Sequence, residues 1–185
     1  NYPSIHTQAQ GEETKIQQAA TGKDTEIVDT VSLSNLIPGE EYALQGEIID
    51  RETGERIQMD VAELFFTAEA EEESKEMLFI MDTSSLQGKT LVIYEYLIHQ
   101  DITVTSHTER FDTAQMIYIP SVETTALDGD TVSHVGTVKK EAVITDIVNY
   151  TNLIPGKSYR VQGTLMVRET GEALLMDGQP VTAEQ

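Results

Sequence analysis

The stretch that decides the fold is Asp29 to Asp60, DTVSLSNLIPGEEYALQGEIIDRETGERIQMD, because the chain contains it twice. The second copy is Asp146 to Asp177, DIVNYTNLIPGKSYRVQGTLMVRETGEALLMD, at an offset of 117 residues, and 17 of the 32 aligned positions are identical. The same offset aligns Pro3–Ala9 (PSIHTQA) with Pro120–Ala126 (PSVETTA). Similarity of this extent indicates an internal repeat of about 117 residues.

The repeat sets the expected domain boundaries and the fold class. We expect one complete repeat at residues 1–119 and the N-terminal part of a second at 120–185, incomplete at its C-terminus. Segments rich in aliphatic and aromatic residues, such as Leu91–Leu97 (LVIYEYL), are separated by Gly and Pro, as at Pro38–Gly39. Short strands between turns predict an all-β fold, with immunoglobulin-like antiparallel β-sandwich repeats in tandem.

The composition argues against several classes of function. The 185 residues include 32 acidic and 12 basic side chains, which gives a net charge of −20. Nucleic acids and anionic membrane surfaces both require basic patches, so neither is an expected partner, and no apolar run is long enough to span a membrane. The chain has no cysteine, which excludes disulfides and thiolate metal sites. No calcium-loop spacing is present, and we expect neither a metal nor a cofactor.

Polar residues recur on the apolar faces of predicted strands. Because strand residues alternate between two faces, Asp29 shares a face with Ile27 and Val31, and Asp146 repeats this placement in the second copy. The same alternation places four further polar residues on apolar faces: Thr7, Thr124, Glu95 and Gln115. Taken singly, each is more often a half-exposed strand residue. A buried carboxylate is costly unless it is paired or neutralised, so the recurrence indicates one shared polar network.

His107 and Gln115 fit this set only if the chain turns between them. They are the ends of the stretch HTERFDTAQ, and eight residues of straight strand span roughly 26 Å at about 3.3 Å each. A hairpin turn at Glu109–Asp112 (ERFD) would bring the two ends together across paired strands. His107 and Gln115 therefore join the set only if a turn lies between them.

One reaction uses all of these residue types. A threonine hydroxyl becomes a nucleophile when a base takes its proton, and histidine is suited to that task near neutral pH. Attack on the carboxamide carbon of a glutamine would expel ammonia and leave an ester between two side chains. A carboxylic acid kept neutral by burial could donate a hydrogen bond to the carbonyl oxygen. Residue types alone do not select this reaction over ordinary strand positions.

The ordered motifs of the chain resemble those of the ester-bond domains, or VaFE repeats, of Gram-positive surface adhesins. The resemblance rests on IHTQA at Ile5–Ala9, the long motif beginning at Asp29, VIYE at Val92–Glu95, and SHTERFDTAQ at Ser106–Gln115. Tyr94 stands where phenylalanine is usual in that family. The resemblance covers the whole first repeat and the start of the second.

The resemblance implies a role for each candidate residue. Thr7 would be the nucleophile, Gln115 the acceptor and His107 the general base. Asp29 and Glu95 would be the acidic pair beside the bond, sharing a proton because two adjacent carboxylates rarely both ionise. The second repeat has two equivalents within this sequence, Thr124 and Asp146.

The resemblance also implies a structural role. The module would be part of an adhesin stalk, stabilised against force and proteolysis by an autocatalytic Thr–Gln ester, and it would not be an enzyme because the bond forms once. Its expected partners are neighbouring repeats of the same chain and, through another domain, a host surface ligand. We expect an extracellular monomer, anchored to the cell wall through a C-terminal region outside this sequence.

Three alternatives remain open at this stage. The first is a ligand-binding adhesin module of the same fold that contacts a host protein or glycan. The second is a lysine–asparagine isopeptide domain, for which Lys15 is the nearest lysine, although the second repeat has Val132 there and the last strand offers Gln115. The third is a hydrolase that uses Thr or Ser with His107 and Asp29, and it predicts turnover on an ester substrate.

Overall fold

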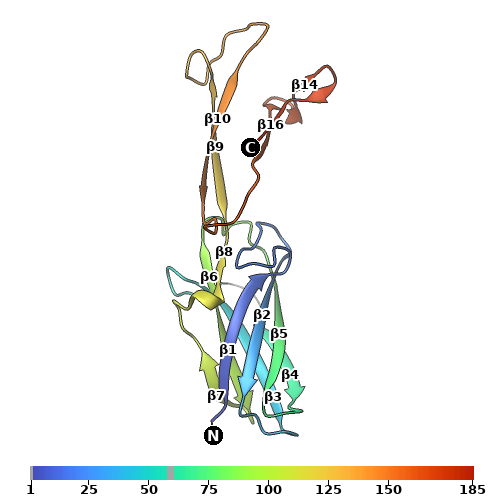
Figure 1. The fold of residues 1–185 in the computed structure, drawn as a ribbon, viewed down its shortest axis with the longest axis vertical. Helices are drawn as coiled ribbons and strands as arrows, with labels where there is room; N and C mark the ends of the chain where they lie inside the picture. Colours follow the sequence, from blue (N-terminus) through green and yellow to red (C-terminus); the bar gives the residue numbers. More distant parts are fainter. Residues whose placement is uncertain (1, 58–60) are drawn as a thin grey trace. The chain divides into compact units, whose positions relative to one another are not determined.

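The first repeat folds into two antiparallel sheets that face one another (Figure 1). The computed structural model describes residues 2–57 and 61–185. One sheet has the order β1-β2-β5, formed by β1 Ser4–Gly11, β2 Thr25–Ser34 and β5 Glu73–Met81. The other has the order β4-β3-β6-β7, with β8 also paired to β6; its strands are β3 Glu41–Asp50, β4 Ala62–Thr67, β6 Thr90–His99, β7 Ile102–His107 and β8 Met116–Tyr118. The predicted all-β sandwich is confirmed.

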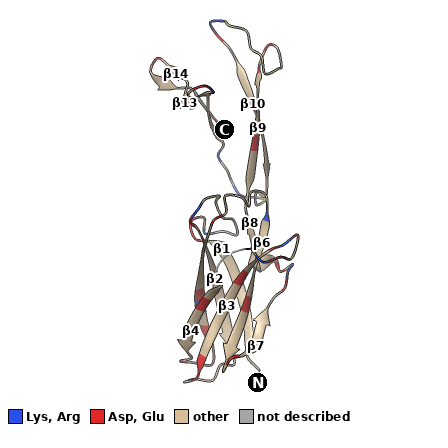
Figure 2. Ribbon diagram, turned by 180° about the vertical axis from the view of Figure 1, so that it is seen from behind, with Lys and Arg blue, Asp and Glu red and all other residues tan. Residues whose placement is uncertain are grey.

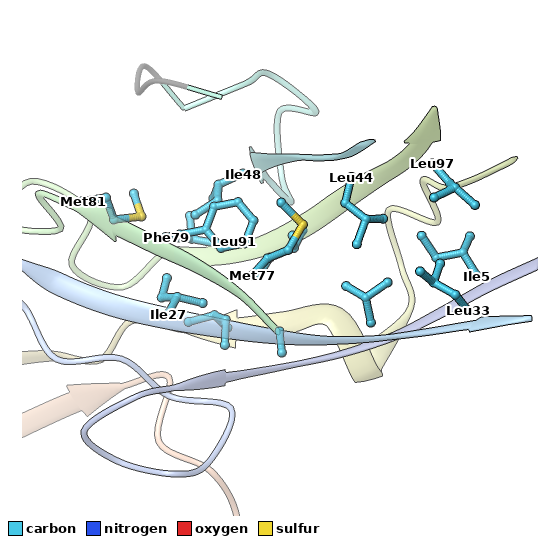
Figure 3. Packing of buried hydrophobic residues seen from close by; sticks show 14 of the residues in the cluster. Ile5, Ile27, Leu33, Leu44, Ile48, Met77, Phe79, Met81, Leu91 and Leu97 are labelled. Atoms are coloured by element: carbon cyan, nitrogen blue, oxygen red, sulfur yellow. The ribbon is translucent and has the colours of Figure 1, made fainter. Parts of the chain in front are cut away.

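Alternating apolar residues of both sheets form one core between them. Phe79 of β5 points toward Ile48 of β3 and Leu91 of β6 (Figure 3). Phe79 packs over Gly46, where an added Cβ would come within 2.5 Å of the Phe79 ring. The glycine therefore leaves the space that the aromatic ring fills.

The surface of the sandwich is acidic. Asp and Glu, drawn red in Figure 2, recur along its strands, whereas the blue of Lys and Arg is sparse. Among the residues that the structure describes, no helix is long and apolar enough to cross a membrane. The only helical element in that part of the chain is the short 3-10 helix η1, Thr113–Gln115.

The turn considered at Glu109–Asp112 is present, since the N–H of Asp112 donates to the carbonyl of Glu109 at 3.0 Å. It does not close a hairpin, because β7 and β8 do not pair with each other. Both pair antiparallel with β6, with His107 opposite Glu95 and Met116 opposite Val92. After His107, the last residue of β7, the chain stops pairing with β6 and turns through η1. It then pairs with β6 again, as β8, at a different position along that strand. Glu95 and Val92 are about 10 Å apart along β6 at about 3.3 Å per residue, which is the approximate separation of the two ends of the excursion.

The second repeat reproduces the first strand pair. In β9 (Ser121–Asp128) and β10 (Ile144–Thr151), Thr124 lies opposite Val148, and Ala126 lies opposite Asp146. The equivalent pairs in β1 and β2 have the same register. Beyond β10 the strands are short: β11 Gln162–Thr164, β12 Met166–Val167, β13 Glu172–Ala173, β14 Leu175–Met176, β15 Gln179–Pro180 and β16 Thr182–Glu184.

The chain divides into two compact units, Asn1–Leu153 and Ile154–Gln185. The pair β9–β10 therefore belongs to the same unit as the first repeat. The second unit holds the short strands β11–β16, which form two-stranded antiparallel pairs such as β11 with β16.

Candidate cross-linking site

Thr7 and Gln115 are in contact inside the sandwich. Thr7 lies in β1 and is 8% exposed, and Gln115, the last residue of η1, is fully buried. Nε2 of Gln115 donates a hydrogen bond to Oγ1 of Thr7, although the two residues are 108 positions apart in the chain. A hydroxyl oxygen and a carboxamide from opposite ends of the repeat are thus held together away from water.

Backbone pairing between the first and last segments of the repeat supports this contact. The N–H of Tyr118 in β8 donates to the carbonyl of Gln17 at 2.9 Å, and the N–H of Ala19 donates to the carbonyl of Tyr118 at 3.1 Å. The side chain of Gln17 also donates to the carbonyl of Met116 at 3.0 Å. The segment that follows β1 therefore lies alongside β8, which fixes η1 next to β1.

Asp29 and Glu95 come from different sheets, β2 and β6, and both are fully buried. Burial, and after it the neighbouring Asp29 carboxyl, raise the pKa of Glu95 to about 11, whereas contact with the Thr7 hydroxyl acts in the opposite direction. Burial also raises the pKa of Asp29. Two carboxylates that face each other in the interior cannot both ionise, so the pair holds a proton at neutral pH.

The unpaired oxygens of the site agree with a shared proton. Among the described residues, both oxygens of Asp29 and Oε1 of Glu95 are buried and make no full hydrogen bond, and only the backbone of Gln8 approaches Asp29 closely enough to oppose the rise in its pKa. Two ionised carboxylates have only acceptors to offer. A proton on Glu95 turns this contact into a hydrogen bond and satisfies the buried pair.

The carboxamide of Gln115 is close to the same acid. Its Nε2 lies 3.4 Å from Oε2 of Glu95, while its buried oxygen has no hydrogen-bond partner among the described groups. A half-turn of the amide about its last bond exchanges the oxygen and the nitrogen. The carbonyl oxygen then faces Glu95, where a neutral carboxyl can donate to it.

His107 ends β7 directly opposite Glu95 in the β6–β7 ladder, so both side chains are on the same face of the sheet. Its Nε2 lies 2.8 Å from Oδ2 of Asp112. Asp112 is also the N-cap of η1: its Oδ1 accepts the N–H of Ala114 at 2.9 Å, and its carbonyl accepts the N–H of Gln115 at 3.2 Å.

Sequence reasoning missed Asp112 as a site residue. The available signal was its position three residues before Gln115, since aspartate is a preferred N-cap. That signal predicts a helix start and gives no indication of a contact with His107. The contact depends on the way in which both β7 and β8 pair with β6.

The two equivalents in the second repeat are not part of such a site in this structure. Thr124 and Asp146 are both exposed, although their strands have the register of the first repeat. The residues equivalent to Glu95, His107 and Gln115 fall outside the sequence. Within residues 1–185, all five candidate positions are present in the first repeat.

The geometry bears on two of the alternatives. Lys15, the lysine of an isopeptide site, is on the surface and pairs with Glu12. A pocket of about 510 Å³ is lined by residues between Gly11 and Glu26, and none of the five candidate residues lines it. Four of these five are buried, so the groups in position to react with Thr7 are side chains of the chain itself.

Comparisons with known proteins agree with this reading. The sequence model of the T-Q ester bond containing domain matches residues 3–119 and again residues 120–185. No curated protein matches the sequence. Two crystal structures of a bacterial adhesin from Mobiluncus mulieris, described as containing intramolecular disulfide, isopeptide and ester bond cross-links, are similar in fold.

The similarity to the adhesin structures extends over all of this chain and 77% and 76% of theirs, with TM-scores of 0.52 and 0.53 and 13% sequence identity. At that identity it supports the fold alone. The family model covers both repeats. The chain belongs to the family of T-Q ester bond containing domains.

Proposed function

We propose that the first repeat is a stalk module of a bacterial surface adhesin, closed by an ester bond between Thr7 and Gln115. The observation that carries the proposal is the buried contact between Oγ1 of Thr7 and the carboxamide of Gln115. It joins the first strand of the repeat to its last segment, and no external reactant is needed.

The bond forms in one balanced sequence of steps. His107 takes the proton of the Thr7 hydroxyl, and the oxygen attacks the carboxamide carbon of Gln115. Neutral Glu95, hydrogen-bonded to Asp29, donates to the carbonyl oxygen as negative charge develops on it. The carbon–nitrogen bond then breaks, the nitrogen takes up the proton from His107, and ammonia leaves. The product is an ester, and no water is consumed.

Burial supports the second half of this sequence. A carboxyl group can stabilise a developing oxyanion only while it carries its proton, and burial keeps Glu95 protonated well above neutral pH. Each catalytic group acts once, because the ester stays in the protein. We therefore propose self-cross-linking without turnover.

The bond would give the module mechanical and thermodynamic stability in a chain that has no cysteine. It closes a loop between residues 108 positions apart, and the chain-entropy model for cross-links values such a loop at about 4 to 5 kcal/mol. Tension applied at the ends of the repeat would pass through the covalent link. These properties suit a spacer at the surface of a cell, and we propose an extracellular, wall-anchored parent protein.

Intact mass tests the proposal directly. Wild-type chain should be lighter than its amino-acid sequence by one ammonia, as should Thr7→Ser, which keeps a hydroxyl. Thr7→Val, which has nearly the same shape without the hydroxyl, should have the unmodified mass. Trypsin cleaves after Lys15, Arg110 and Lys139, so peptides 1–15 and 111–139 should be recovered joined from wild type and from Thr7→Ser, and separate from Thr7→Val. A wild-type mass equal to that of the sequence would refute the proposal.

A further inference from the structure

One asparagine of the second repeat, Asn152, makes hydrogen bonds to the first repeat. Asn152 follows β10, and its Nδ2 donates to two adjacent carbonyls of the first repeat, those of Gly88 at 2.8 Å and Lys89 at 2.9 Å. The same nitrogen lies 3.3 Å from the carbonyl oxygen of Ile119, where the first repeat ends. The two hydrogens of the amide thus point at a pair of acceptors on the loop before β6.

The acceptor surface is held in place by its own hydrogen bonds. The N–H of Gly88 donates to the carbonyl of Ile119, and the N–H of Ile119 donates to the carbonyl of Lys89, both at 3.0 Å. Gly88 has a φ of +77°, a conformation that favours glycine, and its open side faces Thr151 and Ser121 of the second repeat.

A bond in the reverse direction completes the contact. Gln18 of the first repeat is 7% exposed, and its Nε2 donates to the backbone carbonyl of Asn152 at 3.3 Å. The turn that holds Asn152 therefore both donates to and accepts from the first repeat. We call this surface of the first repeat, formed by Gln18, Gly88, Lys89 and Ile119, the end surface.

Asn35 is the residue of the first repeat equivalent to Asn152, and comparing the two shows which hydrogen bonds of Asn152 are made to the other repeat. Asn35 and Asn152 have nearly the same backbone conformation, with φ of +57° and +58°. Nδ2 of Asn35 donates to the carbonyl of Tyr2 at 3.0 Å, and Tyr2 is the counterpart of Ile119. Each asparagine thus donates to the residue just before the proline, Pro3 or Pro120, that precedes the first strand of its repeat. The bonds from Asn152 to Gly88 and Lys89 are made to the preceding repeat.

We propose that Asn152 is the joint between consecutive repeats, and that the end surface is an interaction site whose partner is the asparagine turn of the following repeat. Asparagine is also tolerated in left-handed turns for conformational reasons alone. A purely conformational role would explain the positive φ of Asn35 and Asn152. It would not explain why the Asn152 amide donates to the carbonyls of Gly88 and Lys89. The joint does not depend on the ester bond, so its test is separate from that of the proposed function.

The decisive variant is Asn152→Gly, because glycine keeps the left-handed turn and removes only the amide. Asn35→Gly is the matched control, with the same change at the same position of the other repeat. The chain has no cysteine, so nitroxide labels can be placed on cysteines introduced at Glu76 in β5 and Glu123 in β9, both exposed. Pulsed electron double resonance then measures the distribution of distances between the first repeat and β9–β10.

We expect one narrow distribution for the wild type and for Asn35→Gly. For Asn152→Gly it should become roughly twice as broad, because neighbouring domains held by few contacts move freely by default. Asn152→Asp should broaden it as well, since a carboxylate oxygen would then face the carbonyls of Gly88 and Lys89. An unchanged distribution for Asn152→Gly, or equal broadening for Asn35→Gly, would overturn the proposal.

Discussion

Nε2 of His107 lies 2.8 Å from Oδ2 of Asp112, and the other oxygen of that carboxylate accepts the N–H of Ala114 at 2.9 Å. One side chain therefore holds the proposed base and also caps η1, the turn that presents Gln115. A carboxylate only accepts hydrogen bonds, so Nε2 of His107 is the donor in this contact, and in the neutral ring Nδ1 is the nitrogen that can accept a proton. Asp112 is a positioning residue for the proposed reaction.

Replacing Asp112 by asparagine should slow cross-linking without unfolding the module. Asparagine is an equally good N-cap, so η1 remains, but the carboxylate that orients His107 is lost. We expect the reaction to slow by roughly 10- to 100-fold, a part of the factor of about 10²–10⁴ that a positioned base contributes. The measurement is the mass of freshly purified protein, followed over time at several pH values as ammonia is lost.

Removing a different negative charge from the same loop is the control for Asp112→Asn. Glu109 is exposed, and Glu109→Gln should react as fast as wild type. The pH dependence of the rate should also change in Asp112→Asn, which loss of structure alone would not produce. If Asp112→Asn reacts like wild type at every pH, Asp112 has no positioning role.

The sequence predicted the part of the site that lies on straight strands. Thr7, Asp29 and Glu95 sit on regular strands, and the two-residue alternation of side chains places each on the interior face. The 117-residue offset gave the same register for Asp146. These predictions depend only on the alternation of side chains between the two faces of a strand, which is the same in every regular strand.

The region between His107 and Gln115 could not be predicted in this way. A polar stretch between two strands is compatible with a hairpin and equally with an excursion that returns to the same neighbour. Long-range pairing with β6 and with the segment that contains Gln17 decides between them. The role of Asp112 depends on the same pairing, and therefore became visible only in three dimensions.

The stability of the uncross-linked module should fall as the pH rises. The folded state keeps a proton on Glu95, with a pKa of about 11 against an ordinary value of 4.5, so the unfolded chain releases that proton first. The stabilisation is complete below about pH 4.5 and is lost progressively toward pH 11, by at most about 1.4 kcal/mol per pH unit for one proton.

Urea unfolding of Thr7→Val between pH 5 and 9 measures this dependence at roughly unit intervals. Adding Glu95→Gln, which cannot ionise, should flatten the profile, whereas Glu76→Gln on the surface should leave the slope intact. Equal slopes with and without Glu95 would show that the buried pair does not hold the proton.

The cross-link itself should account for a large part of the stability of the first repeat. Thr7→Val should unfold at lower urea concentration than wild type. Its free energy of unfolding should be lower by about 4 kcal/mol, because no cross-link restricts the unfolded chain. Thr7→Ser should keep most of the stability, because its hydroxyl can still react. A difference below about 1 kcal/mol between the two variants would be too small for a loop of this length.

Gly46 should be intolerant of even one added carbon. A Cβ there would lie 2.5 Å from the ring of Phe79, so Gly46→Ala should cost about 1 to 3 kcal/mol by overpacking. The second repeat supplies a matched control at Gly163, where an added Cβ meets nothing within 4 Å. Gly163→Ala should leave the unfolding midpoint unchanged, and Phe79→Leu should reduce the penalty at Gly46. Equal effects of the two alanine variants would contradict the role of the Phe79 contact.

Force applied to the two ends of the chain should distinguish a load-bearing stalk module from an uncross-linked binding module. In the wild type the proposed ester would carry the tension, so the chain between Thr7 and Gln115 would not extend. Those residues are 108 positions apart, and at about 3.3 Å per residue their release adds on the order of 350 Å of length. Single-molecule stretching should record this extra length in Thr7→Val and not in wild type or Thr7→Ser. The second repeat extends equally in all three proteins and serves as an internal reference. Release of the full length from wild type would show that the first repeat bears load through its hydrogen bonds alone, and the stalk proposal would lose its physical basis.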